Sequence, residues 1–198
     1  MLTAVLRGAE VVNPLEVAVG FLEKWAYEAD VDASPMSFEE ADLRRANRGG
    51  ARISAAEIAA ILERRREIDG SLRRIGPGES LTDTASSIPW IALTQLFDAF
   101  ANIRGVGFSK MTKALHRKRP ALIPMLDSVV QEYLTKDDPV TSSSESFGAR
   151  ATALVRSYKR DLDRNRSALD ELKRKLATRD YRLTEVRILD LLIWSVNA

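Results

Sequence analysis

Cysteine is missing from this 198-residue sequence, and histidine occurs once, at His116. Without cysteine the chain cannot form disulfides, thiolate zinc sites, cysteine-bound iron–sulfur clusters or a cysteine nucleophile. One histidine also leaves no room for a metal site built from several histidines. We therefore expect no metal centre, and any chemistry must rest on oxygen and amine groups.

Long apolar runs are also absent. Residues 189–194 form one of the longest, yet they include an aspartate and fall far short of the ~20 residues that span a bilayer. The first fifteen residues carry Arg7 and Glu10 and lack the continuous apolar stretch of a secretory signal. We expect a cytoplasmic protein with no membrane partner.

Strand-like alternation is scarce, whereas helix signals recur along the chain. Pro14 follows Asn13 as a first-turn proline, and the pairs Ser37 with Glu40 and Ser54 with Glu57 resemble capping boxes. The expected helices cover about 14–29, 37–48, 54 onward, 89 onward, 149–178 and 185–196, with loops at 76–87 and 137–148, the second mobile. The pattern predicts an all-α fold in one domain over residues 1–198.

Positive charge is concentrated in one segment of an otherwise balanced chain. The net charge is only +2, but residues 104–119 hold six arginines or lysines, together with His116, and no acid. A basic patch of this kind is typical of a surface that binds nucleic acid, although it also suits a solvated helix.

Two glycines, Gly105 and Gly107, lie within the basic segment, between an apolar helix and a helix that begins near Phe108. Glycines permit a tight turn whose amide N–H groups point outward at a helix N-terminus, where a phosphate can bind. Lys110, Lys113 and the cluster 117–119 would add salt-sensitive contacts with neighbouring phosphates. The alternative is a plain turn between two helices.

The segment from about 95 to 136 resembles the helix-hairpin-helix and catalytic-aspartate region of the base-excision DNA glycosylase superfamily. The shared features are the hairpin Gly105-Val106-Gly107, a following helix, and Ile123-Pro124-Met125-Leu126-Asp127 opening another helix. The first hairpin glycine and Asp127 are 22 positions apart, which is similar to the adenine-removing branch. The resemblance implies a helix-hairpin-helix fold that binds duplex DNA.

The same resemblance suggests roles for individual residues. Asp127 matches the catalytic aspartate, whose charge would stabilise an oxocarbenium-like sugar; alternatively, it is only a helix N-cap. Ser109 stands where bifunctional members have a nucleophilic lysine, so a glycosylase of this kind would be monofunctional and use water. No cofactor is required, although a monovalent cation could bind the hairpin backbone. The expected DNA contacts are Gly105, Val106, Gly107, Ser109, Lys110, Lys113, Arg117, Lys118 and Arg119.

Over its whole length the chain resembles a bacterial family of unknown function. The shared motifs are the GVG hairpin, a KRPxLxPxxDSxV element at 118–130 and an RxLDxxxW element at 187–194. That resemblance implies no activity, and an ion pair between Arg187 and Asp190 within one helical turn is the simplest role for the last motif.

Three functions remain open at this point. The first is a monofunctional DNA glycosylase that uses Asp127, and the second is a non-catalytic DNA-binding module with the same hairpin. The third is a protein-interaction module, in which an apolar stripe between residues 154 and 176 contacts another chain. A buried, capping Asp127 would favour the second, and an exposed stripe would favour the third.

Overall fold

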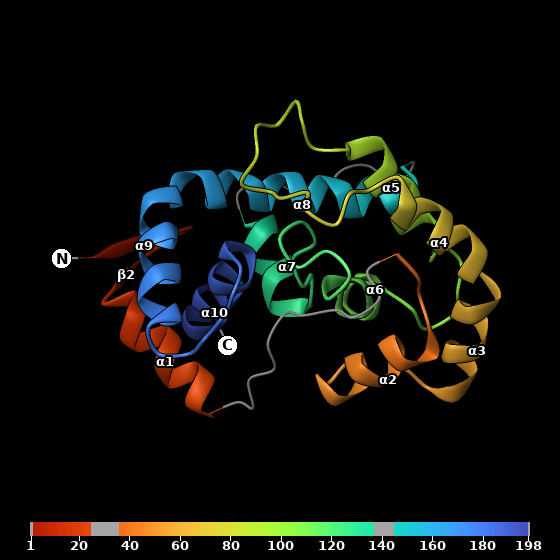
Figure 1. Cartoon of the computed structure of the whole chain (residues 1–198), viewed down its shortest axis with the longest axis horizontal. Coiled ribbons are helices and arrows are strands. Elements are labelled where there is room, and N and C mark those ends of the chain that lie inside the picture. Colours follow the sequence, from red (N-terminus) through yellow and green to blue (C-terminus); the bar gives the residue numbers. More distant parts are fainter. Residues whose placement is uncertain (1, 25–35, 137–144, 198) are drawn as a thin grey trace.

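The computed structural model describes residues 2–24, 36–136 and 145–197, and the described part of the chain is mainly α-helical (Figure 1). Its helices are α1 (Pro14–Lys24), α2 (Glu40–Arg48), α3 (Ala55–Glu63), α4 (Arg65–Arg73), α5 (Trp90–Asp98), α6 (Phe108–His116), α7 (Ser128–Thr135), α8 (Phe147–Arg164), α9 (Arg166–Ala177) and α10 (Glu185–Asn197). None of these helices is both long and apolar enough to cross a membrane.

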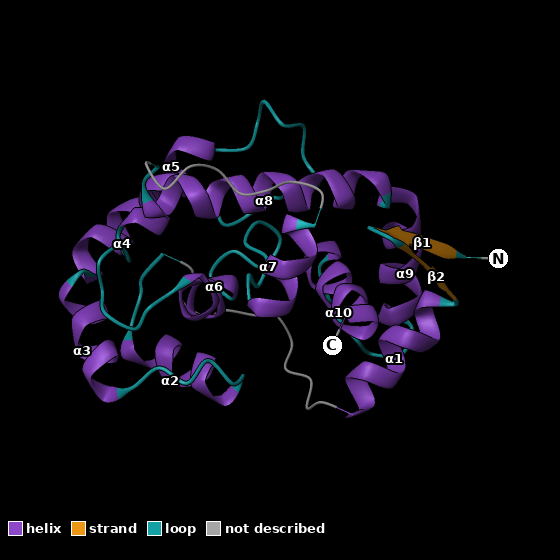
Figure 2. Ribbon diagram, turned by 180° about the vertical axis from the view of Figure 1, so that it is seen from behind, coloured by secondary structure: helices purple, strands orange, loops and turns teal. Residues whose placement is uncertain are grey.

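A β-hairpin at the N-terminus corrects the prediction of a chain without strands. Strands β1 (Thr3–Leu6) and β2 (Ala9–Val12) pair antiparallel, and Thr3 lies opposite Val12 (Figure 2). Asn165 accepts a hydrogen bond from the Val5 amide (2.7 Å) and donates one to the Val5 carbonyl (2.8 Å). The hairpin thus gains a partner for one edge from a side chain 160 residues away, which no local pattern reveals.

The predicted helix starts are partly confirmed. Helix α1 begins at Pro14 as expected, while the rest of the predicted helix, 25–29, lies outside the described residues. Ser54 and Glu57 form the expected capping box of α3. The N-cap of α2 is instead Glu39, paired with Asp42, so the capping box expected at Ser37 was wrong.

The long helix expected over 149–178 is two helices, α8 and α9, which meet at Asn165. Asn165 breaks the run because its side chain donates to the Asp161 carbonyl as well as to β1. Helix α8 also begins two residues early, at Phe147, and Ser146 caps it, so the predicted mobile loop cannot extend to 148. The apolar stripe is buried at Leu154, Tyr158, Leu162, Leu169, Leu172 and Leu176, and is therefore no docking surface.

Helix α8 lies along α5, and the two pack closely at Gly148 (Figures 1 and 2). The Gly148 amide donates to the Asp98 carboxylate (2.6 Å), and a side chain at this position would collide with the Thr94 carbonyl. One turn further on, Thr94 and Thr152 share a hydrogen bond of 2.8 Å. This close contact fixes α5, the helix that leads into the predicted hairpin.

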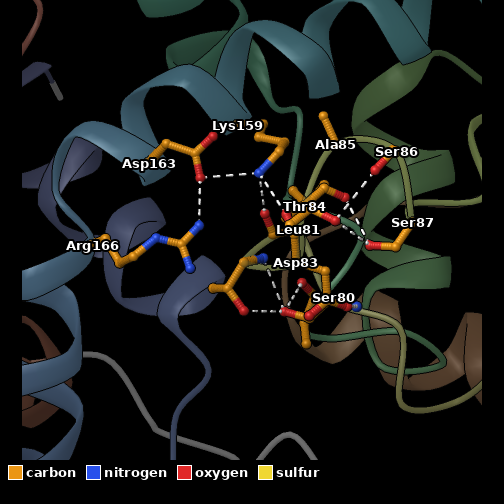
Figure 3. A network of polar contacts seen from close by, with 12 residues as sticks. Ser80, Leu81, Asp83, Thr84, Ala85, Ser86, Ser87, Lys159, Asp163 and Arg166 are labelled. Atoms are coloured by element: carbon orange, nitrogen blue, oxygen red, sulfur yellow. Dashed lines mark hydrogen bonds and ion pairs between the residues drawn. The ribbon is translucent and has the colours of Figure 1, made fainter.

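The polar segment 76–87 is non-helical, as predicted, but α8 holds it in place (Figure 3). The buried Lys159 ammonium donates to the carbonyls of Leu81 and Asp83 and to the Asp163 carboxylate, at 2.9, 2.9 and 3.0 Å. Arg166 donates to the same carboxylate (2.8 Å). The three hydrogen bonds compensate for the free energy that burying the Lys159 charge costs, and the role of this residue is structural.

Candidate functional site

The turn between α5 and α6 is the structural feature on which the predicted site depends. Its backbone takes positive φ at Asn102 (61°) and at Gly105 (83°), and Gly107 is the extended N-cap of α6 without a side-chain cap. The positive φ of Gly105 disfavours any other residue at this position. A Cβ there would also push aside the end of the Glu57 side chain, which lies against the turn.

The predicted hairpin residues separate into anchoring and exposed groups. Val106 is buried, so its side chain fixes the turn to the core, whereas Gly105 and Gly107 are exposed. Ser109 lies in the first turn of α6, where backbone N–H groups have no partner within the helix. The exposed backbone at this helix start is a feature that an anion can bind.

Two of the predicted DNA contacts lie in the interior of the protein. Lys118 is 3% exposed and pairs with Asp42 of α2 at 2.9 Å. Arg119 is 0% exposed and donates to the carbonyls of Leu72 and Ile75, at the end of α4. These side chains join α6 to α2 and α4, so in this structure they do not present their charge at the surface.

Four other cations lie in the turn or along the helix that follows it. Lys110 donates to both carboxylate oxygens of Glu57, at 2.6 and 2.8 Å. Lys113 and Arg117 are half-buried further along α6, and Arg104 is exposed directly before Gly105. Among the residues that the structure describes, no acid pairs with Arg104 or Lys113. We use the term hairpin surface for five of these residues: Arg104, Gly105, Gly107, Lys110 and Lys113.

An open groove of about 520 Å³ lies between α3 and the turn. Helix α3 and its two capping residues contribute Ser54, Glu57 and Arg64, and the turn contributes Asn102, Arg104 and Gly105. Glu57 therefore belongs to the groove and also touches the hairpin surface. Sequence reasoning assigned it only to a capping box, because its contact with Gly105 joins residues 48 positions apart.

Asp127 lies elsewhere, at the start of α7, and is 7% exposed. One carboxylate oxygen accepts from the Val130 amide (3.1 Å), as expected of an N-cap, and the other accepts from the Trp194 indole N–H (2.8 Å). Asp127 is not among the residues that line the groove. Protein donors thus occupy both oxygens, as a helix cap requires, and the catalytic role of Asp127 stays a prediction.

The RxLDxxxW element holds the segment that contains Asp127. Asp190 accepts from the Met125 amide (3.2 Å), one turn of α10 before Trp194. The ion pair expected between Arg187 and Asp190 is not found among the described residues, where one Asp190 oxygen has no hydrogen-bond partner. Burial raises the pKa of Asp190 to about 6, although the charges of Arg187 and His116 oppose the rise. Residues 187–194 of α10 therefore hold the segment 123–127 in place through hydrogen bonds. This structural contact explains why the two motifs occur together in the sequence.

A glycosylase would stack an extruded base on aromatic side chains, but two half-buried aromatic residues, Trp90 and Phe108, have structural contacts. The Trp90 indole donates to the Ala85 carbonyl (2.8 Å) and lies under the Arg156 guanidinium, 4.1 Å from the ring centroid. Phe108 packs against Phe147 with ring centroids 4.8 Å apart. No base-binding pocket is defined by the aromatic residues that the structure places.

Together these observations define a mainly α-helical protein with an exposed glycine turn beside basic side chains. The chain belongs to a family of unknown function (DUF6308), whose model matches residues 15–197. The predicted membership of such a family is confirmed, whereas the comparisons give no match to the DNA glycosylase superfamily. No curated protein and no solved structure matches the chain significantly.

Proposed function

We propose that the protein binds the sugar–phosphate backbone of duplex DNA through the hairpin surface, without chemistry. The observation that carries this proposal is the exposure of Gly105 and Gly107, with Arg104 directly before them and Lys113 on the helix that follows. Neither cation pairs with an acid in the described ranges. Backbone amides at a helix start and mobile cations beside them are the groups that proteins use to hold phosphates.

The arrangement of elements supports a helix-hairpin-helix type of unit. An apolar helix, α5, leads into the glycine turn, a basic helix, α6, leaves it, and α7 opens at Asp127. Contacts of this kind address phosphates and not base edges, so binding should be independent of sequence and sensitive to salt. The monovalent cation expected at the hairpin backbone stays a prediction.

Non-catalytic binding is favoured over a glycosylase by the surroundings of Asp127. A carboxylate that stabilises a sugar cation must face the substrate, whereas this one accepts hydrogen bonds from Val130 and Trp194 and lies outside the groove. The protein-interaction alternative loses its main argument, because the stripe on α8 and α9 is buried.

Neutralising Arg104 and Lys113 tests the proposal. The double variant Arg104→Gln with Lys113→Gln should bind a fluorescent duplex about tenfold or more weakly at low salt, and its log–log salt slope should flatten by about 2. Fluorescence anisotropy across a salt series measures both quantities on several unrelated duplex sequences.

The control is Arg174→Gln with Lys175→Gln, which removes the same net charge from exposed positions on α9, far from α6 (Figure 1), and also breaks the exposed pair of Lys175 with Glu171. Equal affinity loss in both double variants would reduce the effect to net charge and contradict the proposal. Alkali-revealed strand cleavage on a panel of damaged duplexes, run beside the binding assay, should give no product; cleavage that Asp127→Asn abolishes would establish the glycosylase instead.

A further inference from the structure

Glu57 places a carboxylate on the hairpin surface. Its side chain lies against the Cα of Gly105, and both of its oxygens accept from the Lys110 ammonium, at 2.6 and 2.8 Å. The carboxylate is mostly buried between α3 and the turn, with 12% of the side chain exposed. An anion supplied by the protein thus lies where the proposed function requires a phosphate.

Helix capping does not explain the charge of Glu57. In the capping box of α3 the Glu57 carboxylate accepts from the Ser54 amide (2.7 Å), a task that glutamine performs equally well. The contact with Lys110, by contrast, is an ion pair of short distance and depends on the negative charge. Burial opposes this charge, but the hydrogen bonds from Lys110 and Ser54 outweigh it and lower the pKa of Glu57, so the carboxylate is ionised at neutral pH.

We propose that Glu57 is an intramolecular competitor that occupies Lys110 and the Gly105 turn in the free protein and that a backbone phosphate must displace. This inference rests on the proposed function and adds its regulation. A phosphodiester carries one negative charge, as the carboxylate does, so exchanging one for the other at Lys110 alone gains little. Displacement becomes favourable only when neighbouring phosphates also reach Arg104 and Lys113, and the competitor therefore selects polynucleotides over single phosphate ions.

The variant Glu57→Gln tests this inference, because it removes the charge while keeping the helix cap. It should bind duplex DNA about five- to twentyfold more tightly than wild type at low salt, with a salt slope steeper by about 1, since Lys110 is released for a phosphate contact. The matched control is Glu63→Gln, which removes the same charge from an exposed position of α3 that also lines the groove. Its affinity should stay within about twofold of wild type.

The outcomes separate this inference from the proposed function. If wild type binds and Glu57→Gln gains no more than Glu63→Gln, the competitor is rejected while the binding surface stands. If neither wild type nor Glu57→Gln binds any duplex, the proposed function is rejected and the inference with it. Circular dichroism establishes the folding of each variant, and Glu57→Ala, which also lacks the carboxylate, must bind as tightly as Glu57→Gln.

Discussion

The carboxylate of Asp127 joins the start of α7 to α10, and the strength of this connection can be measured. Asp127→Ala removes the acceptor for the Val130 amide and leaves the Trp194 indole N–H without its partner. We expect the free energy of unfolding to fall by about 1–3 kcal/mol. Urea denaturation followed by circular dichroism measures the loss.

A double-mutant cycle with Trp194→Phe separates the two hydrogen bonds. Phenylalanine keeps a ring in place but lacks the N–H, so it should cost less in the Asp127→Ala background than in wild type, with a coupling energy of about 1 kcal/mol. Additive losses would show that the indole hydrogen bond contributes nothing to stability and would leave one oxygen of Asp127 available for another task.

Asp190 should give the protein a stability that decreases as the solution approaches neutral pH. Burial raises the pKa of this carboxyl from 3.8 to about 6, so the folded protein keeps a proton that the unfolded chain has lost. The stabilisation is therefore complete below pH 3.8 and disappears as the pH rises through about 6. Arg187, His116 and Tyr158 are the titratable groups that act on Asp190 in this surrounding.

Comparing unfolding free energies at several pH values between 4 and 7 checks the effect. The difference between Asp190→Asn and wild type should move in favour of the variant as the pH rises, because asparagine has no proton to lose. Asp170→Asn, at an exposed position on α9, should keep the shape of the wild-type profile. Parallel profiles for wild type and Asp190→Asn would contradict the assignment.

Sequence reasoning at the level of single residues located the hairpin but could not sort its charges. Arg104 and Lys118 look alike in a run of cations, yet one is exposed and the other pairs with Asp42 inside the protein. The difference in exposure arises because α2 packs on α6. The sequence of residues 104–119 alone does not reveal this contact. The same limit explains why Glu57 was read as a cap and Asp127 as either a cap or a catalyst.

At the scale of the elements, the close contact between α5 and α8 should be sensitive to one added methyl group. Gly148→Ala introduces a methyl group that collides with the Thr94 carbonyl and the Asp98 carboxylate. Although alanine normally favours a helix over glycine, we expect a net destabilisation of about 1–3 kcal/mol, because two packed helices must separate. Thermal unfolding monitored by circular dichroism measures it.

Gly70 provides the matched control for this substitution. It lies within α4, and a methyl group there would meet no atom within 4 Å. Gly70→Ala should therefore leave stability unchanged or raise it by up to about 1 kcal/mol. If both alanine variants gained stability, the close approach of α5 and α8 would be disproved.

The elements themselves were predictable where local signals act alone. Ser54 with Glu57 started α3 as the capping-box pattern indicated, and the helix expected over 185–196 is α10, Glu185–Asn197. The sequence did not predict the N-terminal hairpin or the end of α8 at Asn165. The two features contact each other in the folded protein, where the Asn165 side chain hydrogen-bonds to Val5 of β1. Asparagine in a charged helical run carries no local signal that it will also bind a strand.

At the scale of the whole molecule, the first residues of the chain are held by the last third of it. The buried Arg7 guanidinium donates to the Asp161 carboxylate (2.7 Å) and to the Leu134 carbonyl (2.6 Å), and Asn165 holds β1. Helix α10 contacts both α1 and α7. The mainly helical class follows from composition and periodicity. The contacts between the N-terminal hairpin and the C-terminal helices, by contrast, can be seen only in the folded structure.

The long-range hydrogen bonds of Lys159, Arg7 and Asn165 have a consequence for the order of folding. They join residues 78, 154 and 160 positions apart, so none of them can form on a ribosome until α8 has emerged. The segment at 80–87 and the β-hairpin must therefore wait, although both are synthesised early, and α5 also waits for α8. The contact of α3 with the glycine turn and Lys110 joins residues 48 and 53 positions apart and can form earlier. The hairpin surface would then take shape before the N-terminus of the same chain finds its place.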